Sequence, residues 1–262
     1  MLNALTRKLW GTALIEQQVL KVGDELFQKM PAQKKKAEQV LKDAADKFIP
    51  GNNIKINSMT TSEFLEQPKL IAFCDQVSPF QSNIILNFKR LKEKPKEFIC
   101  DFVHELTHAL QDTRQKALWK RERVNKELKL GNFSFGVYDR ILNNLDNYQI
   151  TSNDFNGTKF KAKANKKLEK IITNTMRKSV APFLFFEQTE KVRVVYKEIM
   201  LRAINEVQAY KNEALFVKQH NLPVDKGGLF YLEVHKQIIN HAKEDLKKLK
   251  DKDFVSSVIK NA

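Results

Sequence analysis

The sequence predicts a mainly helical α+β fold with a small antiparallel sheet placed before a central helix. Three observations support this prediction. Apolar residues recur at helical spacing over the first 48 residues, the pattern changes to short β-rich segments between residues 51 and 88, and helical spacing returns at Pro95. Helices that flank one group of strands, without alternating with them, are typical of the α+β class.

Two helices are expected before the sheet. Apolar residues follow helical spacing over residues 1–30, where Pro31 interrupts the pattern. A second helical pattern covers residues 32–48 and ends at Pro50 and Gly51.

Three short strands are expected next. Residues 54–56 alternate between apolar and polar side chains, and residues 69–77 and 83–88 are rich in β-branched and aromatic side chains. Residues 78–82 contain a proline and two serines, which favour a turn. We therefore expect an antiparallel hairpin and one further strand.

The second half of the chain predicts further helices. A helix is expected from Pro95, a favourable first-turn residue, to about residue 130, where Gly131 ends it. Residues 151–167 are polar and aperiodic and predict a surface loop. A long helix is expected over residues 187–218, and a final basic helix over residues 229–250.

The composition limits the class of protein. The chain has 262 residues, with 46 Lys and Arg against 31 Asp and Glu, giving a net charge of +15. Such a charge is typical of nucleic-acid or anionic-membrane binding, but no RNA-binding signature, zinc finger or glycine-rich phosphate loop accompanies it, so we interpret the lysines as solvated helix faces.

Cellular location can also be predicted from sequence. Two cysteines, Cys74 and Cys100, are too few for a disulfide framework and favour a reducing compartment. No apolar run approaches the roughly 18 residues that span a bilayer, and the charged N-terminal segment does not resemble a signal peptide. We therefore expect a soluble cytoplasmic protein, with export by a route without a cleavable signal left open.

The segment with the clearest chemistry is DFVHELTHALQD, residues 101–112. On a helix His104 and His108 share a face because they are four residues apart, and Glu105 lies beside them. In an HExxH motif the two neutral imidazoles bind zinc, while the glutamate takes a proton from water that the metal activates. The alternative interpretation is a pair of partly buried structural histidines.

This helix, preceded by the segments IAFCDQV and NIILNF, resembles the zincin metallopeptidases. It is most similar to the branch whose third zinc ligand is a downstream glutamate. The branch with a third histidine shortly after the motif is disfavoured, because Asp112, Thr113 and Arg114 stand there and the next histidine is His220. The resemblance implies a zincin-like fold and Zn2+ as the cofactor.

With this resemblance we expect a single metallopeptidase-like domain over residues 1–262. It would consist of an N-terminal helical segment (1–50), a zincin-like core (51–220) and a C-terminal basic helix (221–262). Only the HExxH helix is a specific match.

The third zinc ligand is predicted to be Glu206. Glu206 is the only carboxylate in an apolar row that runs along the long helix from Val192 to Val217, and a buried carboxylate requires a cation or several donors. The segment AINEVQAYKNEA also resembles the glutamate-bearing helix of these zincins, although Tyr210 stands where the thermolysin-like form has an aspartate. Glu213 and His220 remain alternatives.

Cys100 is not expected to bind the metal. It lies four residues before His104, and three ligands spread over eight residues of one straight helix span about 12 Å, too far to meet at one ion. For a donor to the oxyanion that forms during hydrolysis, the spacing does not choose between the candidates, which are Tyr196, Tyr210, His220, Tyr231 and His235.

The sequence therefore predicts a zinc metallopeptidase that hydrolyses a peptide or protein substrate. His104, His108 and Glu206 bind Zn2+, Glu105 is the general base, and an extended peptide lies against the sheet edge. One alternative is a non-catalytic basic helical module that binds nucleic acid or anionic surfaces. Another is a zincin scaffold that has lost its activity.

Overall fold

The chain divides into two compact units, which we describe separately. The first comprises Met1–Leu118 and Gln208–Val224, and the second comprises Trp119–Val207 and Asp225–Ala262. The single domain expected from the sequence stays a prediction. The structure is a computed structural model, and it describes residues 2–30, 34–49, 53–60, 72–78, 81–114, 128–146, 154–156 and 159–260.

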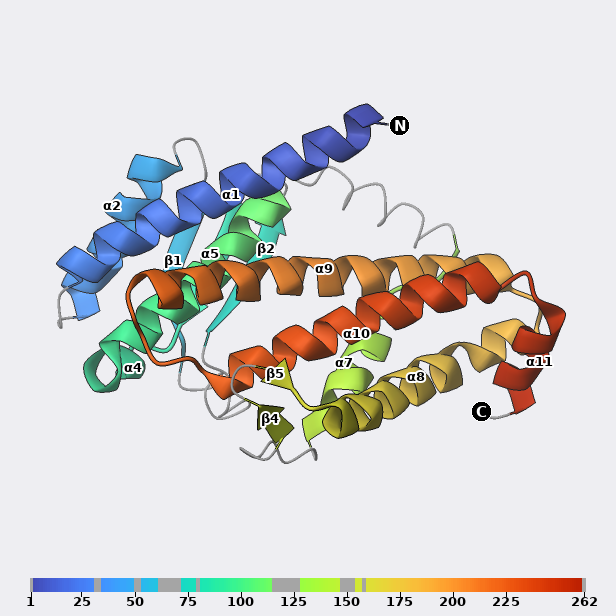
Figure 1. The fold of residues 1–262 in the computed structure, drawn as a ribbon. Coiled ribbons are helices and arrows are strands. Elements are labelled where there is room, and N and C mark those ends of the chain that lie inside the picture. The colour runs from blue at the N-terminus through green and yellow to red at the C-terminus, as the bar shows by residue number, and fades with distance from the viewer. Residues whose placement is uncertain are drawn as a thin grey trace. The chain divides into compact units, whose positions relative to one another are not determined.

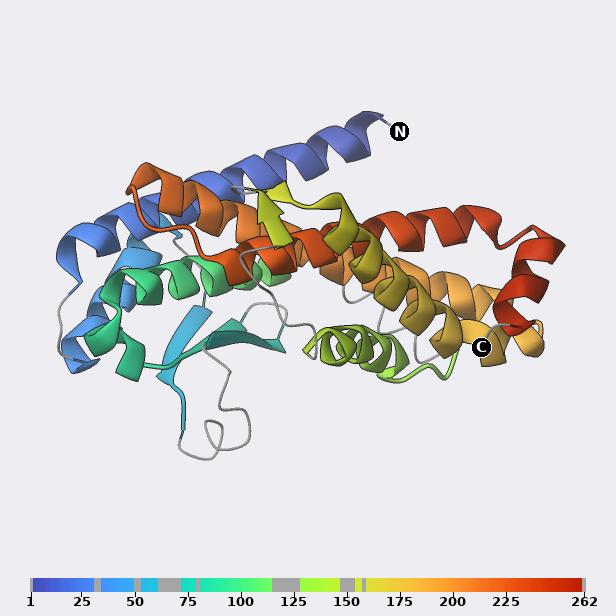
Figure 2. The same cartoon turned by 60° about the horizontal axis from the view of Figure 1, so that its bottom comes forward.

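The first unit is arranged around helix α5 (Pro95–Arg114), which carries the HExxH motif. Helix α1 (Leu2–Lys29) packs on one side of α5, and strands of the sheet pack on another side (Figures 1 and 2). Helix α2 (Lys34–Phe48) contacts α1 and the first strand, and the short helix α4 (Lys89–Glu93) leads into α5. Both predicted N-terminal helices are confirmed.

The sheet of the first unit is mixed. It contains β1 (Asn53–Ser58), β2 (Ala72–Ser78) and β3 (Gln81–Leu86) in the order β1-β3-β2. The predicted hairpin is confirmed, because β2 and β3 pair antiparallel. The expectation of a wholly antiparallel sheet is wrong, because β3 inserts between the other strands and pairs with β1 in parallel. Residues 69–71 of the predicted strand and the turn at 79–80 lie outside the described residues.

The core of the first unit lies between α1, α5 and the sheet. Alternate residues of β3, namely Ser82, Ile84 and Leu86, are buried, as expected for a strand with one face toward a helix. Helix α5 has buried side chains on more than one of its faces, including Phe102, Val103 and Leu106. This burial holds the HExxH helix in a fixed position within the unit.

The C-terminal end of the helix predicted from Pro95 to about residue 130 is not helical in the described residues. Helix α5 ends at Arg114, and residues 115–127 lie outside the described part of the chain. Leu128–Leu130 are not helical, so the helix predicted to reach residue 130 is wrong at that end. Lys129 and Gly131 both have positive φ, of 54° and 50°, a left-handed conformation that an α-helix cannot continue through.

The second unit is a set of packed helices. The predicted long helix is confirmed as α9 (Thr189–Gln219), which belongs to this unit up to Val207, and the predicted basic helix is confirmed as α10 (Lys226–Lys248). Asp225 caps α10 by accepting hydrogen bonds from the Gly227 and Gly228 amides, so the helix begins before the predicted start. Around them lie α7 (Phe133–Asp146), α8 (Ala162–Phe185) and α11 (Lys252–Lys260).

The surface loop predicted over residues 151–167 is wrong in its second part. Short strands β4 (Phe155–Asn156) and β5 (Lys159–Phe160) pair antiparallel, and α8 begins at Ala162. Helix α8 has a buried row at four-residue spacing, which comprises Ala164, Leu168, Ile172 and Met176. Lysines between these residues obscure the helical period in the sequence. None of the described helices has the length and apolar content needed to cross a bilayer.

Candidate metal centre

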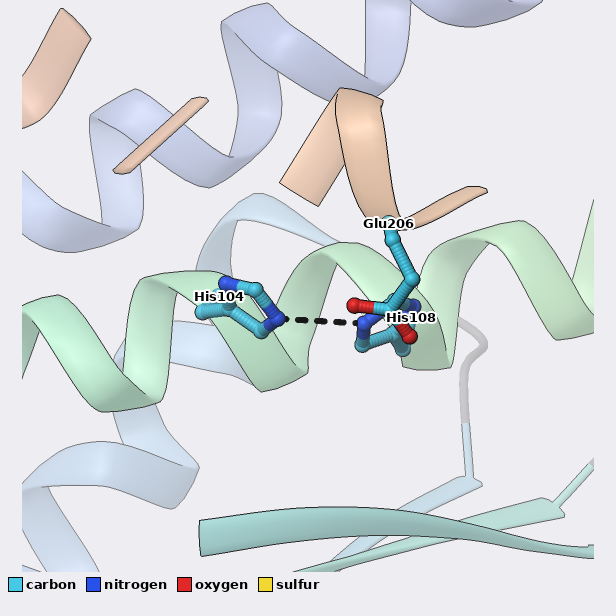
Figure 3. Close-up of side chains that lie close together, drawn as sticks. All are labelled: His104, His108 and Glu206. Carbon is cyan, nitrogen blue, oxygen red and sulfur yellow. Dashed lines mark hydrogen bonds between the residues drawn. The ribbon is translucent and has the colours of Figure 1, made fainter. Parts of the chain in front are cut away.

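Helix α5 places the imidazoles of His104 and His108 side by side, as their four-residue spacing predicts (Figure 3). Their Nε2 atoms are 3.2 Å apart, and the ring centroids are 5.0 Å apart. The His104 side chain is only 12% exposed. The two nitrogens that face each other therefore lie in a mostly desolvated position.

The other nitrogen of each imidazole contacts an acceptor. His104 Nδ1 lies 3.2 Å from Glu213 Oε2, and His108 Nδ1 lies 3.0 Å from Gln111 Oε1. The Gln111 amide nitrogen donates to Gln208 Oε1 at 2.9 Å, which turns Gln111 Oε1 toward His108. Both Nδ1 atoms are then the donors, and both Nε2 lone pairs point into the space between the rings.

This arrangement fits a shared metal ion. Two nitrogens bound to one tetrahedral zinc at about 2.0–2.1 Å are about 3.3 Å apart, close to the spacing between the two Nε2 atoms. Two unprotonated acceptors at 3.2 Å would repel each other, and a cation between them removes that repulsion. Acceptors on the second nitrogen of each histidine are also the usual supports of histidine ligands.

Glu206 completes the group. One ligand atom from each of His104, His108 and Glu206 lies within 4.8 Å of the others, and the Glu206 side chain descends from α9 toward the two rings (Figure 3). The division between the units falls inside α9, two residues after Glu206, so this residue stands on the same continuous helix as Gln208 and Glu213. Full coordination requires its carboxylate to close by roughly 1.5 Å or less, within the reach of side-chain rotation.

Three side-chain hydrogen bonds set the register between α5 and this part of α9. Gln208 pairs with Gln111, and Glu213 pairs with His104, so residue numbers rise along one helix as they fall along the other. Between them the buried Asn212 donates to Thr107 Oγ1 at 3.1 Å, while the Thr107 hydroxyl donates to the Val103 carbonyl.

The two alternative ligands occupy other positions. Glu213 contacts His104 on the Nδ1 side, away from the two facing Nε2 atoms. His220 Nε2 lies 2.8 Å from Asp24 Oδ1, and its ring packs against Phe27 and Phe216. Neither belongs to the metal-ligand group found among the described residues.

Cys100 also lies outside that group. It is buried, and burial, followed by the charges of Glu213, Asp101 and Glu97, raises the pKa of its thiol to about 12. Only the thiolate is a metal ligand, so this cysteine is unsuited to binding at neutral pH. The geometry agrees with the sequence argument that set Cys100 aside.

Further carboxyl groups lie near the site. Glu105 is buried directly beside His104 in the helix. Asp101, one turn earlier, has a pKa raised to about 7, mainly by burial and also by Glu213 and Glu105, despite Arg90 Nε at 2.9 Å. A buried region with several carboxylates favours a bound cation.

Tyr210 is the one oxyanion candidate that the described structure places against the histidines. Its ring centroid lies 4.5 Å from that of His104, edge to face at 70°. Tyr196 donates to Asp245, and His235 contacts the Tyr138 hydroxyl, both within the second unit. Tyr231 packs against His235 in that unit, and His220 contacts Asp24.

Two supporting residues were not assigned from the sequence. Gln111 follows His108 by three residues, a spacing that puts both on one helix face. This spacing could have indicated Gln111 as the partner of His108. Glu213 follows Glu206 by seven residues, so both lie on nearly the same side of α9. The sequence left Glu213 as an alternative ligand, whereas in the structure it contacts His104 Nδ1.

No protein-family model, curated protein or solved structure matches the chain. The resemblance to zincins therefore rests on the HExxH helix and the residues around it. The arrangement of His104, His108 and Glu206 is the basis for the metal-binding function considered next.

Proposed function

We propose that the protein is a zinc-dependent metallopeptidase. The observation that carries the proposal is the pair of His104 and His108 Nε2 atoms at 3.2 Å, each imidazole oriented by an acceptor on Nδ1, with Glu206 beside them. An oriented pair of neutral imidazoles and a carboxylate is the ligand set of one class of catalytic zinc site. That class leaves a fourth position open for substrate or water.

Each residue has a defined role in this proposal. His104, His108 and Glu206 bind the metal, and Glu213 and Gln111 hold the two imidazoles in the binding tautomer. Zinc, when bound, polarises the peptide carbonyl and lowers the pKa of water to about 7. Glu105 accepts the proton of the attacking water and delivers it to the departing amide nitrogen.

The sheet offers a place for an extended peptide. The strand order leaves β2 at an edge of the sheet, and β2 contacts α5. A peptide that adds to this edge as a further strand satisfies its backbone through main-chain hydrogen bonds and passes close to the HExxH helix. The Tyr210 hydroxyl, carried on the ring that touches His104, is the donor we assign to the oxyanion.

A second interpretation of the same geometry is a shared proton. In that case His104 is an imidazolium paired with Glu213, and its Nε2–H donates to His108 Nε2. This is the structure expected of a zincin scaffold that has lost its metal and its activity, or of a basic binding module. Metal content separates these alternatives from the proposal.

The test is zinc per chain, measured by elemental analysis after purification without chelator and again after zinc titration. We expect about one zinc in wild type and far less in His104→Ala. His220→Ala is the matched control, because His220 binds Asp24 and should leave the zinc content unchanged. A wild-type chain that takes up no zinc overturns the proposal, and zinc without cleavage of any peptide in a quenched-fluorescence library supports the inactive scaffold.

A further inference from the structure

The turn between α8 and α9 exposes two adjacent phenylalanines. Phe185 and Phe186 are 66% and 67% exposed, the highest values among the large hydrophobic side chains of the described residues. Their rings meet edge to face, with centroids 5.2 Å apart. Two aromatic side chains held together in solvent carry a free-energy cost that a surface for binding would explain.

The backbone of this turn is closed on itself. Glu187 has a left-handed φ of 57°, its amide donates to the Leu184 carbonyl, and the Gln188 amide donates to the Phe183 carbonyl. These bonds form the Schellman arrangement that ends a helix. The Phe186 amide donates to Pro182 as well, so the amides at the tip are already paired. A tip of this kind can enter an apolar medium without exposing unpaired backbone donors.

The segments that meet near the tip contain an excess of basic residues. The α8–α9 turn, the end of α10 and helix α11 gather at one end of the second unit (Figure 1). The segments 174–197 and 243–260 contain eleven Lys and Arg against six Asp and Glu. Two ion pairs within this set, Asp245 with Arg177 and Glu190 with Arg193, each cancel one charge of either sign and leave the excess of five positive charges unchanged. An excess of positive charge around an apolar tip complements an anionic surface.

The size of the apolar tip favours a lipid surface over a protein partner. Two phenylalanines at this exposure present roughly 130 Å² each. A stable protein interface needs about 800 Å² from each partner, so a second copy or another protein would require much more apolar area. A bilayer can accept single protruding side chains at its interface, where aromatic rings are favoured.

We propose that the Phe185–Phe186 tip and its basic surroundings form a peripheral binding site for an anionic lipid bilayer. The two rings enter the boundary between headgroups and acyl chains, and the lysines attract the negative headgroups. This binding is reversible, because two rings and a diffuse charge provide a modest anchor. The inference does not depend on the zinc site.

The test is co-sedimentation of the full-length chain with vesicles of phosphatidylcholine alone and with phosphatidylserine added. We expect binding only to the phosphatidylserine vesicles, at least tenfold weaker at about 0.5 M salt than at about 0.05 M salt. The double variant Phe185→Ser, Phe186→Ser should lose at least about tenfold of the affinity. The matched control is Leu14→Ser with Val224→Ser, which removes two other exposed side chains and should bind like wild type.

A second measurement reports insertion directly. In Phe185→Trp, the fluorescence of the new tryptophan is obtained by subtracting the wild-type spectrum. It should shift to shorter wavelength when phosphatidylserine vesicles are added and should be quenched by brominated lipids. Equal binding by the double Phe→Ser variant, or no binding by wild type at low salt, overturns the proposal. A tip that drives self-association in ultracentrifugation without binding vesicles overturns it as well.

Discussion

At the level of single residues, the chemistry of the site depends on which nitrogen of each imidazole carries the proton. Glu213 and Gln111 both accept from Nδ1, so they direct the Nε2 lone pairs toward one point. The two acceptors differ in charge. The acceptor of His104 is the Glu213 carboxylate, whereas the Gln111 amide orients His108 without adding charge.

Glu105 is expected to be needed for hydrolysis and not for metal binding. Glu105→Gln keeps the size of the buried side chain but cannot take a proton, so zinc content should stay at the wild-type level while peptide hydrolysis falls by about 10²-fold or more. Elemental analysis and a peptidase assay on the same sample measure both quantities. Glu97→Gln, on the exposed side of the same helix, is the control that should retain activity. Wild-type turnover by Glu105→Gln would contradict the mechanism.

Glu206 and Glu213 should differ in their effect on zinc affinity. Glu206→Gln changes a proposed ligand and should weaken zinc binding by at least about tenfold. This loss should exceed that of the same substitution at Glu213, which supports a ligand. For Glu213→Ala we expect zinc affinity to fall by about 10–100-fold. The glutamine of Glu213→Gln can still accept a hydrogen bond from His104 Nδ1 through its amide oxygen, so this variant should lose less zinc affinity.

Competition with a fluorescent zinc chelator gives these affinities. We expect a larger loss of zinc affinity for Glu206→Gln than for Glu213→Gln, and a larger loss for Glu213→Ala than for Glu213→Gln. If Glu213→Gln abolished zinc binding while Glu206→Gln left it intact, the two roles would have to be exchanged.

Part of the site could be predicted from the sequence because its residues are close together in the chain. The spacing of His104 and His108 fixes their common face before any tertiary structure is known. Glu206 was predicted as the third ligand because a carboxylate in an apolar row needs a positive partner, and it lies in the one possible metal-ligand group among the described residues. The role of Glu213 depends on the register between α5 and α9, which is set by tertiary hydrogen bonds such as Asn212 to Thr107 and leaves no local signal.

At the level of elements, the position of α5 depends on a close approach by α1. Gly23 of α1 is buried, and a Cβ atom there would lie 2.8 Å from the Phe216 ring and 3.0 Å from Val103. Phe216 and Val103 are themselves fully buried, so neither can move aside easily. This glycine therefore allows α1 to pack against the helices that carry the histidines and Glu213.

Gly23→Ala should destabilise the protein, although alanine is the better helix former. The clash in a packed core costs about 1–3 kcal/mol, which exceeds the helix propensity gained. Gly136→Ala in α7 is the matched control, because a Cβ there meets no atom within 4 Å and should stabilise the protein by up to about 1 kcal/mol. Urea unfolding of both variants measures the two changes, and a stabilising Gly23→Ala would contradict the packing described.

The elements that were predicted correctly have strong local patterns. Helices α1, α2 and α9 have sustained apolar spacing, and the β2–β3 hairpin has two β-rich segments around a turn. The parallel pairing of β1 was missed because strand direction depends on a long connection and not on the strand itself. Helix α8 was not predicted, because lysines between its buried residues obscure the helical period.

At the level of the whole molecule, each unit has its own hydrophobic core. The first includes Leu26, Leu86 and Leu106, and the second includes Leu168, Ile199 and Ile238. Two of the three proposed ligands, His104 and His108, belong to the first unit, together with their partners Gln111 and Glu213, whereas Glu206 is counted with the second. Metal binding should therefore stabilise the two units unequally.

Removal of zinc is expected to loosen the first unit selectively. A ligand that binds only the folded state adds about 2.7 kcal/mol at a concentration of 100 times Kd, and that energy acts on the segments that must be folded to form the site. In hydrogen exchange, α5 and the part of α9 from Glu206 onward should exchange faster after chelation, while α8 and α10 should be little changed. His104→Ala, which lacks a ligand, should show no difference between zinc and chelator. An equal loss of protection in α10 and α5 would contradict this prediction, because it would mean that both cores unfold as one cooperative unit.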